Sequence, residues 1–302
     1  MNRLLRNSAE CGGFTLIELI IVMLLTGILA GVLFMILRGP LQTYIQVERR
    51  VALADILETA MLRMTREIRL ALPYSVRTKS SGGAKAVEFI RTLDGGRYRA
   101  RGVNRLKFNQ SSGTFDVFNT LVNFGAIDVA TTGTPSQECV SSQADCLVVY
   151  NIGQPKTAAT AVTNGFSANV YLGASNTYKG NIAAVTAAGA NSVSFSNSDL
   201  PLWRFGMQSP QQRFNIIDTP VSFVCNGTEI HRYSDYALTE TQLTNPGGSS
   251  SLLIDQVSTC QFDYEEPTLT RFGLLTIRIM VTEPQSGESA SLLQQIHVTN
   301  IP

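Results

Sequence analysis

The chain has 302 residues, of which 44% are hydrophobic and only 16% are charged. This length suits one large domain or two ordinary ones, and the composition excludes a disordered acidic or basic chain, a coiled coil and a collagen. The 24 basic and 23 acidic side chains nearly cancel, so the net charge does not indicate a nucleic-acid partner. The charges are nevertheless segregated, because residues 1–110 hold 17 basic and 8 acidic side chains, whereas residues 111–302 hold 7 and 15.

The N-terminal segment predicts a membrane anchor. A basic and polar stretch, residues 1–13, precedes an apolar run over residues 14–37 in which Glu18 is the one charged residue. As a helix this run would be about 36 Å long, more than the roughly 30 Å of a bilayer's hydrocarbon layer. It is too long for an ordinary secretory signal peptide, and no small-x-small cleavage site follows it. The basic leader favours a cytoplasmic N-terminus, although Arg38, Arg49 and Arg50 beyond the run weaken that preference.

Glu18 needs an explanation, because a carboxylate in the hydrocarbon layer costs roughly 2.5–3.5 kcal/mol on insertion scales. One possibility is an anchor whose carboxylate extends to the membrane interface. The other is cleavage after Gly13, which would leave the α-amine of Phe14 as a cation in the same apolar surroundings. We therefore expect Glu18 to be partnered by a new N-terminus.

The residues that carry this idea, Gly13-Phe14-Thr15-Leu16-Ile17-Glu18-Leu19, resemble the processing signature of type IV prepilins. The resemblance implies that a prepilin peptidase cuts after Gly13 and that Phe14 becomes N-methylated. It also implies that Glu18 pairs with the terminal amine of a neighbouring subunit during filament assembly. The residues Glu10-Cys11-Gly12 depart from the pattern of many relatives, which carry a basic residue or Gln before the cleavage glycine.

Further along the predicted helix, Gly27 and Gly31 lie four residues apart and share one face, which suits close packing of another helix. Gly39 and Pro40 predict a kink or a short melted stretch, since proline lacks the amide donor. Apolar residues then recur with a helical period of about 3.6 residues as far as Leu72, and the following proline predicts the end of the helix. Residues 38–73 are therefore expected to form an amphipathic helix that packs on a globular domain.

Residues 74–302 are expected to form a β-rich globular domain, which gives an α+β fold with a long N-terminal helix. Short apolar runs separated by Gly, Ser, Thr and Asn predict strands at 87–91, 114–118, 147–151, 192–196, 221–225, 257–264, 274–282 and 292–298. The last three alternate apolar and polar residues, which predicts an antiparallel meander with one face against the amphipathic helix. Residues 130–142 and 245–251 are interpreted as loops.

The expected state of each cysteine depends on which side of the membrane it lies. Cys11 lies in the leader and would be discarded, which leaves four cysteines on the oxidising side of the membrane. Three disulfide pairings are possible, of which the simplest joins Cys139 to Cys146 and Cys225 to Cys260. A zinc site is the rival interpretation, but no C-x-x-C is present and the two histidines lack ligand-like spacing. No cofactor is expected.

The sequence does not indicate an enzyme. His231 and His297 have no nucleophile motif beside them, and G-x-S-x-G, P-loop and dinucleotide patterns are absent. Acidic residues before Pro267 could bind calcium, although a solvated turn fits them better. A basic cluster with interleaved aromatics could follow a phosphate backbone, but we interpret it as a solvated or subunit-facing strand pair; it comprises Arg91, Arg97, Tyr98, Arg99, Arg101, Arg105, Lys107 and Phe108.

A wider resemblance covers most of the chain. Residues 49–77, the segment VEFIRTLDGGRYR, residues 213–225 and the ending QQIHVTN are similar to minor pilins of the mannose-sensitive haemagglutinin (MSHA) pilus. The segment TREIRLA also resembles J-type minor pseudopilins of type II secretion and W-type minor pilins. This implies a single-pass inner-membrane subunit with a periplasmic C-terminal domain, which primes or caps a filament at low copy number. Its partners would be the prepilin peptidase, major and other minor pilins and the pilus assembly platform, with no nucleic acid expected. A pilus-tip module that binds glycan, a surface or DNA is the alternative from a different class.

Overall fold

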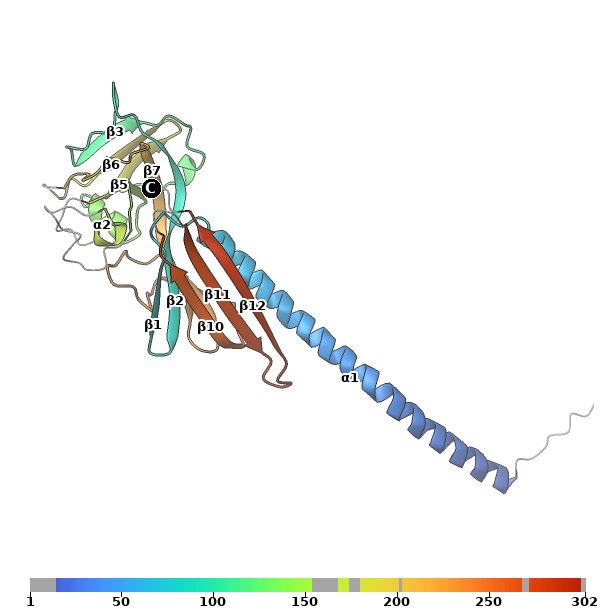
Figure 1. Ribbon diagram of the computed structural model, residues 1–302. Helices are drawn as coiled ribbons and strands as arrows, with labels where there is room; N and C mark the ends of the chain where they lie inside the picture. The colour runs from blue at the N-terminus through green and yellow to red at the C-terminus, as the bar shows by residue number, and fades with distance from the viewer. Residues whose placement is uncertain (1–14, 154–167, 174–179, 201–202, 268–271, 300–302) are drawn as a thin grey trace, which may run out of the picture. The chain divides into compact units, whose positions relative to one another are not determined.

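The computed structural model describes residues 15–153, 168–173, 180–200, 203–267 and 272–299. The chain divides into two compact units, Met1–Ala52 and Leu53–Pro302. A single helix, α1 (Leu16–Ile68), crosses the boundary between them. The remaining elements, all in the second unit, are β-strands and short helices (Figure 1).

Two antiparallel sheets form the second unit. The larger has nine strands in the order β1-β2-β7-β4-β5-β6-β3, with β8 on β7 and β9 on β8. Its strands are β1 (Arg77–Ser81), β2 (Ala84–Arg97), β3 (Ser112–Asp116), β4 (Cys146–Val148), β5 (Ile182–Gly189), β6 (Ser192–Ser196), β7 (Arg213–Cys225), β8 (Ile230–Ser234) and β9 (Ser249–Ile254). The smaller sheet, β10-β11-β12, contains β10 (Val257–Glu265), β11 (Gly273–Thr282) and β12 (Ser289–Val298). The short helices are η1 (Phe124–Ala126), α2 (Pro135–Val140) and α3 (Val170–Gly173).

The three-stranded sheet confirms the predicted meander. Cys260 and Phe262 on β10 and Ile277, Ile279 and Val281 on β11 are buried, while the residues between them face outward or are half-buried. These side chains share one hydrophobic cluster with the C-terminal turns of α1, which contribute Leu53, Leu57, Ala60, Met61, Met64 and Ile68. The apolar stripe of α1 within the second unit is therefore the core-facing side of the helix, as its period predicted.

Two predictions about helix α1 and its end need correction. The predicted melted stretch at Gly39 and Pro40 is absent, because the helix continues through both residues. Pro40 removes one backbone hydrogen bond, whereas ending and restarting a helix would add the cost of a new nucleus. The helix also ends at Ile68, before the predicted Leu72-Pro73. The chain after Ile68 pairs with β2 instead, since Leu72 N–H donates to Ile90 O (2.8 Å) and Thr92 N–H to Leu70 O (2.8 Å).

The strand predictions are also incomplete. The strands β1, β5, β8 and β9 were not predicted, and β2 and β7 extend well beyond the residues 87–91 and 221–225. The two expected loops are partly regular, since residues 130–142 contain α2 and β9 begins within residues 245–251. In β5, Ile182, Ala183, Ala184 and Val185 are all buried, so burial on both faces removes the alternation on which the prediction depended.

Candidate functional site

The first turn of α1 shows why the helix begins where it does. Thr15 precedes the helix, and its Oγ1 accepts a hydrogen bond from the Glu18 backbone N–H (3.3 Å). Its carbonyl accepts from the backbone N–H groups of Glu18 (3.1 Å) and Leu19 (3.2 Å). This is the threonine side of a capping box, Thr-x-x-Glu, a pattern that marks helix N-termini. The Thr-x-x-Glu spacing is visible in the sequence, but the cap was not predicted. Thr15 and Glu18 also belong to the processing signature, and they were interpreted only as part of it.

Glu18 therefore occupies a position in its own helix that favours an acidic residue. It lies in the first turn, where the helix dipole favours a negative charge, and it is the third residue after the cap, where Glu and Gln are preferred. Gly13 and Phe14, the predicted processing residues, lie outside the described residues. The predicted pairing of Glu18 with a terminal amine is thus a proposal, and its place in the first turn of α1 is a second reason for an acidic residue at this position.

The apolar residues of α1 in the first unit are exposed. Every residue from Thr15 to Ala52 is exposed, including the apolar side chains from Leu16 to Leu37. Among the described residues, α1 is the one helix long and apolar enough to cross a membrane. The Thr26 hydroxyl donates to the carbonyl oxygens of Val22 (2.8 Å) and Met23 (3.1 Å), so this polar group is satisfied within the helix. The segment suits an apolar solvent.

The two predicted packing glycines have no close neighbour within the described chain. A Cβ atom built on Gly27 or on Gly31 would meet nothing within 4 Å, and the same holds for Gly39. Nothing inside the described chain therefore requires a glycine at these positions. The predicted close approach of another helix stays a proposal.

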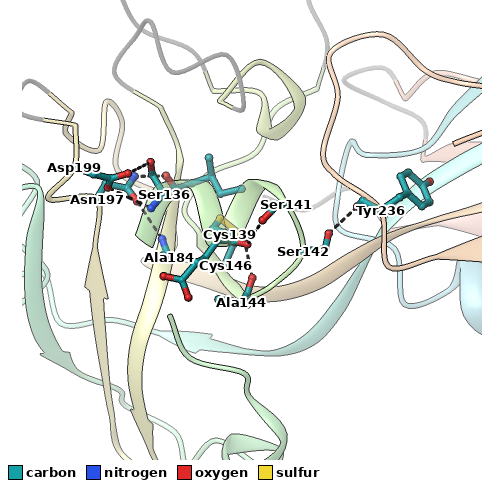
Figure 2. Close-up of a disulfide and its surroundings, with 12 residues drawn as sticks. Ser136, Cys139, Ser141, Ser142, Ala144, Cys146, Ala184, Asn197, Asp199 and Tyr236 are labelled. Carbon is teal, nitrogen blue, oxygen red and sulfur yellow. Dashed lines mark hydrogen bonds between the residues drawn. A yellow bond between two sulfur atoms is a disulfide. The ribbon is translucent and has the colours of Figure 1, made fainter. Parts of the chain in front are cut away.

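Two disulfides join the cysteines of the second unit in the simplest of the three pairings. Cys225 ends β7 and Cys260 lies on β10, so this bond links the nine-stranded sheet to the three-stranded one. Cys139 on α2 is joined to Cys146 on β4 (Figure 2). Cys11 lies outside the described residues. The four cysteines are thus engaged with one another rather than with a zinc ion.

Hydrogen bonds fix the loop around the Cys139–Cys146 bond. The Ser136 hydroxyl donates to Asp199 Oδ2 (2.5 Å), and the Ser142 hydroxyl donates to the carbonyl oxygen of Tyr236 (2.7 Å), as Figure 2 shows. The Leu238 N–H donates to the carbonyl oxygen of Val140 (2.8 Å). The loop closed by this disulfide is therefore also hydrogen-bonded to the irregular segment after β8.

The predicted basic cluster separates into two layers. Tyr98 is fully buried, and Phe108 packs on Tyr98 (5.7 Å between centroids) and on Phe205 (5.9 Å), so these aromatics belong to the core. Arg91 is half-buried and forms an ion pair with Asp218. The other five cations of the cluster are exposed: Arg97, Arg99, Arg101, Arg105 and Lys107. Of the aromatic residues that were predicted to interleave the cations, Tyr98 is consequently covered and Phe108 is half-buried.

The two histidines lie apart from any cluster of ligands. His231 Nε2 is 2.8 Å from Glu229 Oε2, and His297 is exposed on β12. The acidic residues Asp263 and Glu266 at the end of β10 are exposed as well. Within the part of the chain that the structure describes, no group of three or more His, Cys, Asp or Glu side chains is arranged to hold a metal ion.

Sequence reasoning missed a buried ion pair. Arg77 on β1 and Glu88 on β2 are directly paired in the sheet, and Arg77 Nη2 lies 2.6 Å from Glu88 Oε1. Burial raises the pKa of Glu88, while the charge and hydrogen bonds of Arg77 act in the opposite direction. The guanidinium also donates to the carbonyl oxygens of Thr239 (2.9 Å) and Glu240 (2.7 Å). The pair therefore ties the segment after β8 to the sheet, which is a structural role.

The comparisons with known proteins agree with the N-terminal features. A model of the prokaryotic N-terminal methylation motif matches residues 9–34. No curated protein and no solved structure matched the chain. The motif belongs to a structural rather than an enzymatic class of proteins, and it implies processing by a prepilin peptidase and assembly with other pilins. The methylation motif, the exposed apolar helix and the β-rich unit together support a type IV pilin-like protein anchored in the inner membrane.

Proposed function

We propose that this protein is a minor pilin of an MSHA-like type IV pilus, with MshO as the pilin it resembles over most of its length. The observation that carries the proposal is the methylation motif at residues 9–34, which covers most of an apolar helix surface without partners in the described chain. In this proposal residues 1–13 are the leader, residues 14–37 span the membrane, and the helix that follows supports a periplasmic β-rich domain. The two disulfides support an oxidising compartment for that domain.

The proposed mechanism has three steps. The apolar run inserts with its basic leader in the cytoplasm, the peptidase cuts after Gly13, and Phe14 is methylated. The carboxylate of Glu18 then aligns the subunit against the terminal amine of a neighbour. In the hydrocarbon layer this pairing offsets the insertion cost of the carboxylate. The exposed apolar surface of α1 is buried among the helices of other subunits.

The proposal is tested first by Gly13→Ala, which removes the cleavage glycine from the full-length chain. We expect the variant to keep its leader, so mass spectrometry of the membrane-bound protein should show the intact N-terminus. The wild-type chain from the same cells should begin with N-methylated Phe14. Efficient removal of the leader from the variant, or an unprocessed wild-type chain where other prepilins are processed, would refute the proposal.

Substitutions of Glu18 separate its two roles. Glu18→Gln retains a residue that suits the third position of a capping box but removes the charge, whereas Glu18→Ala removes both. We expect both variants to insert, to be cleaved and to incorporate poorly into filaments. Thr15→Ala is the matched control, since it removes the cap and leaves the carboxylate. If Glu18→Gln incorporates normally while Thr15→Ala fails, the residue acts as part of the cap and the pairing is wrong.

A minor pseudopilin of a type II secretion system is the second candidate, favoured by the segment TREIRLA at the end of α1. Co-purification of the intact membrane form with its neighbouring subunits distinguishes the two. Recovery with pilins of an MSHA-like pilus supports the first candidate, and recovery with secretion pseudopilins supports the second.

A further inference from the structure

Strand β12 has a free edge without the features that usually protect an exposed strand. It is the outer strand of the three-stranded sheet and pairs with β11 alone among the described strands (Figure 1). It has ten residues, its register with β11 has no bulge, and it contains no proline, lysine, arginine or acidic residue. Edge strands are usually short, bulged or charged, because a long regular edge pairs readily with another chain. The edge of β12 is therefore open to an added strand.

The other edges of the two sheets are shorter or covered. The nine-stranded sheet ends at β1, β3 and β9, which have five, five and six residues. In the smaller sheet, β10 has a bulge between Val257 and Thr259. The outer side of β10 meets the larger sheet, because Lys85 Nζ donates to the carbonyl oxygen of Cys260 (2.9 Å) and Cys260 is bonded to Cys225. Among the described strands, β12 is thus the longest open edge.

The hydrogen-bond pattern shows which backbone groups of β12 face this edge. Beside the turn between β11 and β12, the Glu283 N–H donates to the carbonyl oxygen of Glu288 (2.9 Å). In an antiparallel ladder such paired residues alternate with residues whose N–H and C=O groups point away from the partner strand. Along the register of β12, the even-numbered residues therefore bond to β11. The backbone groups that face the open edge belong to the odd-numbered residues, among them Ser291, Leu293 and Gln295.

An apolar groove of about 480 Å³ adjoins the free edge. It is lined by the buried side chains of Leu57 and Met61 on α1 and by Ala290 and Leu292 on β12. Ile279 on β11, which pairs with Leu292, is fully buried, whereas Leu292 and Ala290 are only half-buried. The core-facing side of the sheet is thus incompletely covered at β12. A strand added beside β12 would place its own core-facing side chains next to these residues.

Two charges on the helical side of the groove indicate what the added strand carries. Glu58 and Arg69 line the groove, are exposed, and form no ion pair with another described residue. They are eleven residues apart on α1, which is about 16 Å. An extended segment covers a similar distance in four to six residues, and side chains four or six positions apart face the same side. A base and an acid at that spacing would match both charges. The β12 strand of a second copy has no acidic or basic residue to do so.

We propose that the free edge of β12 receives an extended segment of a different protein, which adds to the small sheet as a fourth strand. The segment has apolar side chains at alternate positions, which fill the groove, and a basic and an acidic residue that face Glu58 and Arg69. Main-chain hydrogen bonds to β12 provide affinity, and the alternate side chains provide specificity. This contact goes beyond the proposed assembly role, because it involves an unlike partner and the second unit rather than the methylation motif.

Two synthetic peptides test the contact on the full chain in detergent micelles. The first is Glu-Thr-Val-Thr-Val-Thr-Lys, acetylated, amidated and labelled with a fluorophore, and the second has the two charged residues exchanged. In both, the valines and the charges share one face of the extended peptide. Fluorescence anisotropy should show that one peptide binds at least tenfold more tightly than the other. A strand added in one direction brings opposite charges together in one order only.

Charge exchange on α1 tests which side chains are recognised. Glu58→Lys combined with Arg69→Glu should reverse the preference between the two peptides. Asp55→Lys combined with Arg66→Glu is the matched control, because these exposed residues have the same spacing on α1 but do not line the groove. The control variant should keep the wild-type preference.

N-methylated peptides test the backbone pairing separately from the side chains. Every second N–H of an added strand faces β12, so methylating one alternate set removes hydrogen bonds and methylating the other does not. The tighter peptide is therefore methylated either at its two valines or at its first two threonines. One of these forms should lose at least tenfold in affinity and the other should bind nearly as before. Binding of the unmethylated peptide should also protect the amides of Ser291, Leu293 and Gln295 from hydrogen exchange.

Four outcomes would overturn the proposal. They are the absence of binding by either peptide, a preference that the Glu58 and Arg69 exchange does not reverse, equal affinities of the two N-methylated forms, and protection of amides elsewhere than on β12. Sedimentation of the same samples shows whether a second copy already occupies the edge, which would also contradict an unlike partner. Every variant keeps residues 1–37 unchanged, so leader cleavage can be measured in parallel. A failed contact with normal cleavage would leave the proposed function standing.

Discussion

The two parts of helix α1 have similar apolar side chains in opposite surroundings. From Leu16 to Ala52 the helix is exposed, and its large apolar side chains have no cover within the first unit. From Leu53 to Ile68, in the second unit, one face of the same helix is buried, including Leu57, Met64 and Ile68. The backbone conformation is the same throughout. What differs is the cover, which the chain itself supplies for the second part and which the described residues do not supply for the first.

The arrangement of apolar residues in each part of α1 matches the surroundings of that part. In the second unit the apolar residues follow a stripe, because the opposite face meets water; Leu62 on that face is exposed. In the first part, apolar residues surround the helix from Leu19 to Leu37, which is expected where the solvent is itself apolar. Substitutions in the second part should therefore change the stability of the β-rich unit, whereas those in the first part should change insertion and assembly.

The largest change in stability is expected from the two disulfides, because both lie in the second unit. They therefore test whether changes in this unit alter stability and leave insertion and leader cleavage unchanged. Replacing Cys225 and Cys260 by Ala opens the larger loop and should lower the free energy of unfolding by about 4 kcal/mol, against about 2.5 kcal/mol for Cys139 and Cys146. Denaturant unfolding of the full chain in detergent, followed by circular dichroism and by the fluorescence of the buried Trp203, measures both changes. Equal losses for the two pairs would contradict the chain-entropy argument, and altered leader cleavage would contradict the division itself.

Matched methionine substitutions compare the two parts of α1 directly. Met64 is fully buried in the second unit, whereas Met35 is 79% exposed in the first. Met64→Ala should lower the free energy of unfolding by about 3 kcal/mol, since it loses buried apolar contacts and leaves a cavity. Met35→Ala should change it by less than about 0.5 kcal/mol. The same unfolding experiment measures both. A loss of stability from Met35→Ala as large as that from Met64→Ala would show that the exposed part of α1 packs on the chain.

A pH-dependent test acts within the second unit alone. Burial, with smaller contributions from the charges of Asp218 and Asp128, raises the pKa of Asp145 from 3.8 to about 7, and the Asp128 backbone N–H opposes this shift. The folded chain thus holds this proton more tightly than the unfolded chain. Its contribution to stability is complete below about pH 4 and is lost as the pH rises to about 7.

Asp145→Asn removes this titration and keeps an oxygen that accepts the Asp128 N–H (2.9 Å in the wild type). Relative to the wild type, the variant should gain on the order of 2 kcal/mol in the free energy of unfolding between pH 4 and pH 7. Asp263→Asn, an exposed carboxyl on β10, controls for the loss of a negative charge. A difference between the Asp145 variant and the wild type that does not change with pH would rule out the raised pKa.

The sequence predicted those features that depend on local periodicity. The alternation on β10 and β11 and the apolar stripe of α1 within the second unit each follow from one face meeting the core. Features that depend on pairing between distant residues were not predictable in this way. The Arg77–Glu88 pair requires the register of β1 on β2, and its contacts to Thr239 and Glu240 require the fold. The end of α1 was misplaced for the same reason, because a backbone pairing with β2 replaces the last turn.

The features of the candidate site also differ in whether the sequence alone could predict them. The methylation motif, the apolar run and the carboxylate in the first turn lie in neighbouring residues, so the sequence alone indicates them. Cleavage after Gly13 stays a prediction, because Gly13 and Phe14 lie outside the described structure. The exposure of Val103 and Phe118 was not anticipated. Their exposure depends on which residues the sheet covers, and neither Val103 nor Phe118 carries a local signal for it.

The smallest effect on stability is expected at the two glycines of the first unit. Substitutions there should change assembly without changing stability, which is the clearest contrast with the second part of α1. Gly31→Leu meets no other part of the described chain, so the free energy of unfolding should change by less than about 0.5 kcal/mol. If another subunit's helix packs against this face, the added side chain separates the two helices and removes their close contacts. Incorporation into sheared filaments should then fall, although insertion and leader cleavage continue.

Ala30→Leu provides the control, because it adds a large side chain one position away, on a different face of the same exposed segment. A defect restricted to Gly31→Leu and Gly27→Leu would place a helix partner on the glycine face. Equal incorporation of all three variants would mean that the glycines are interchangeable with other apolar residues of the span. A side chain with no neighbour in its own chain can disturb assembly only through a neighbour in another, so this result depends on contacts that the monomer does not contain.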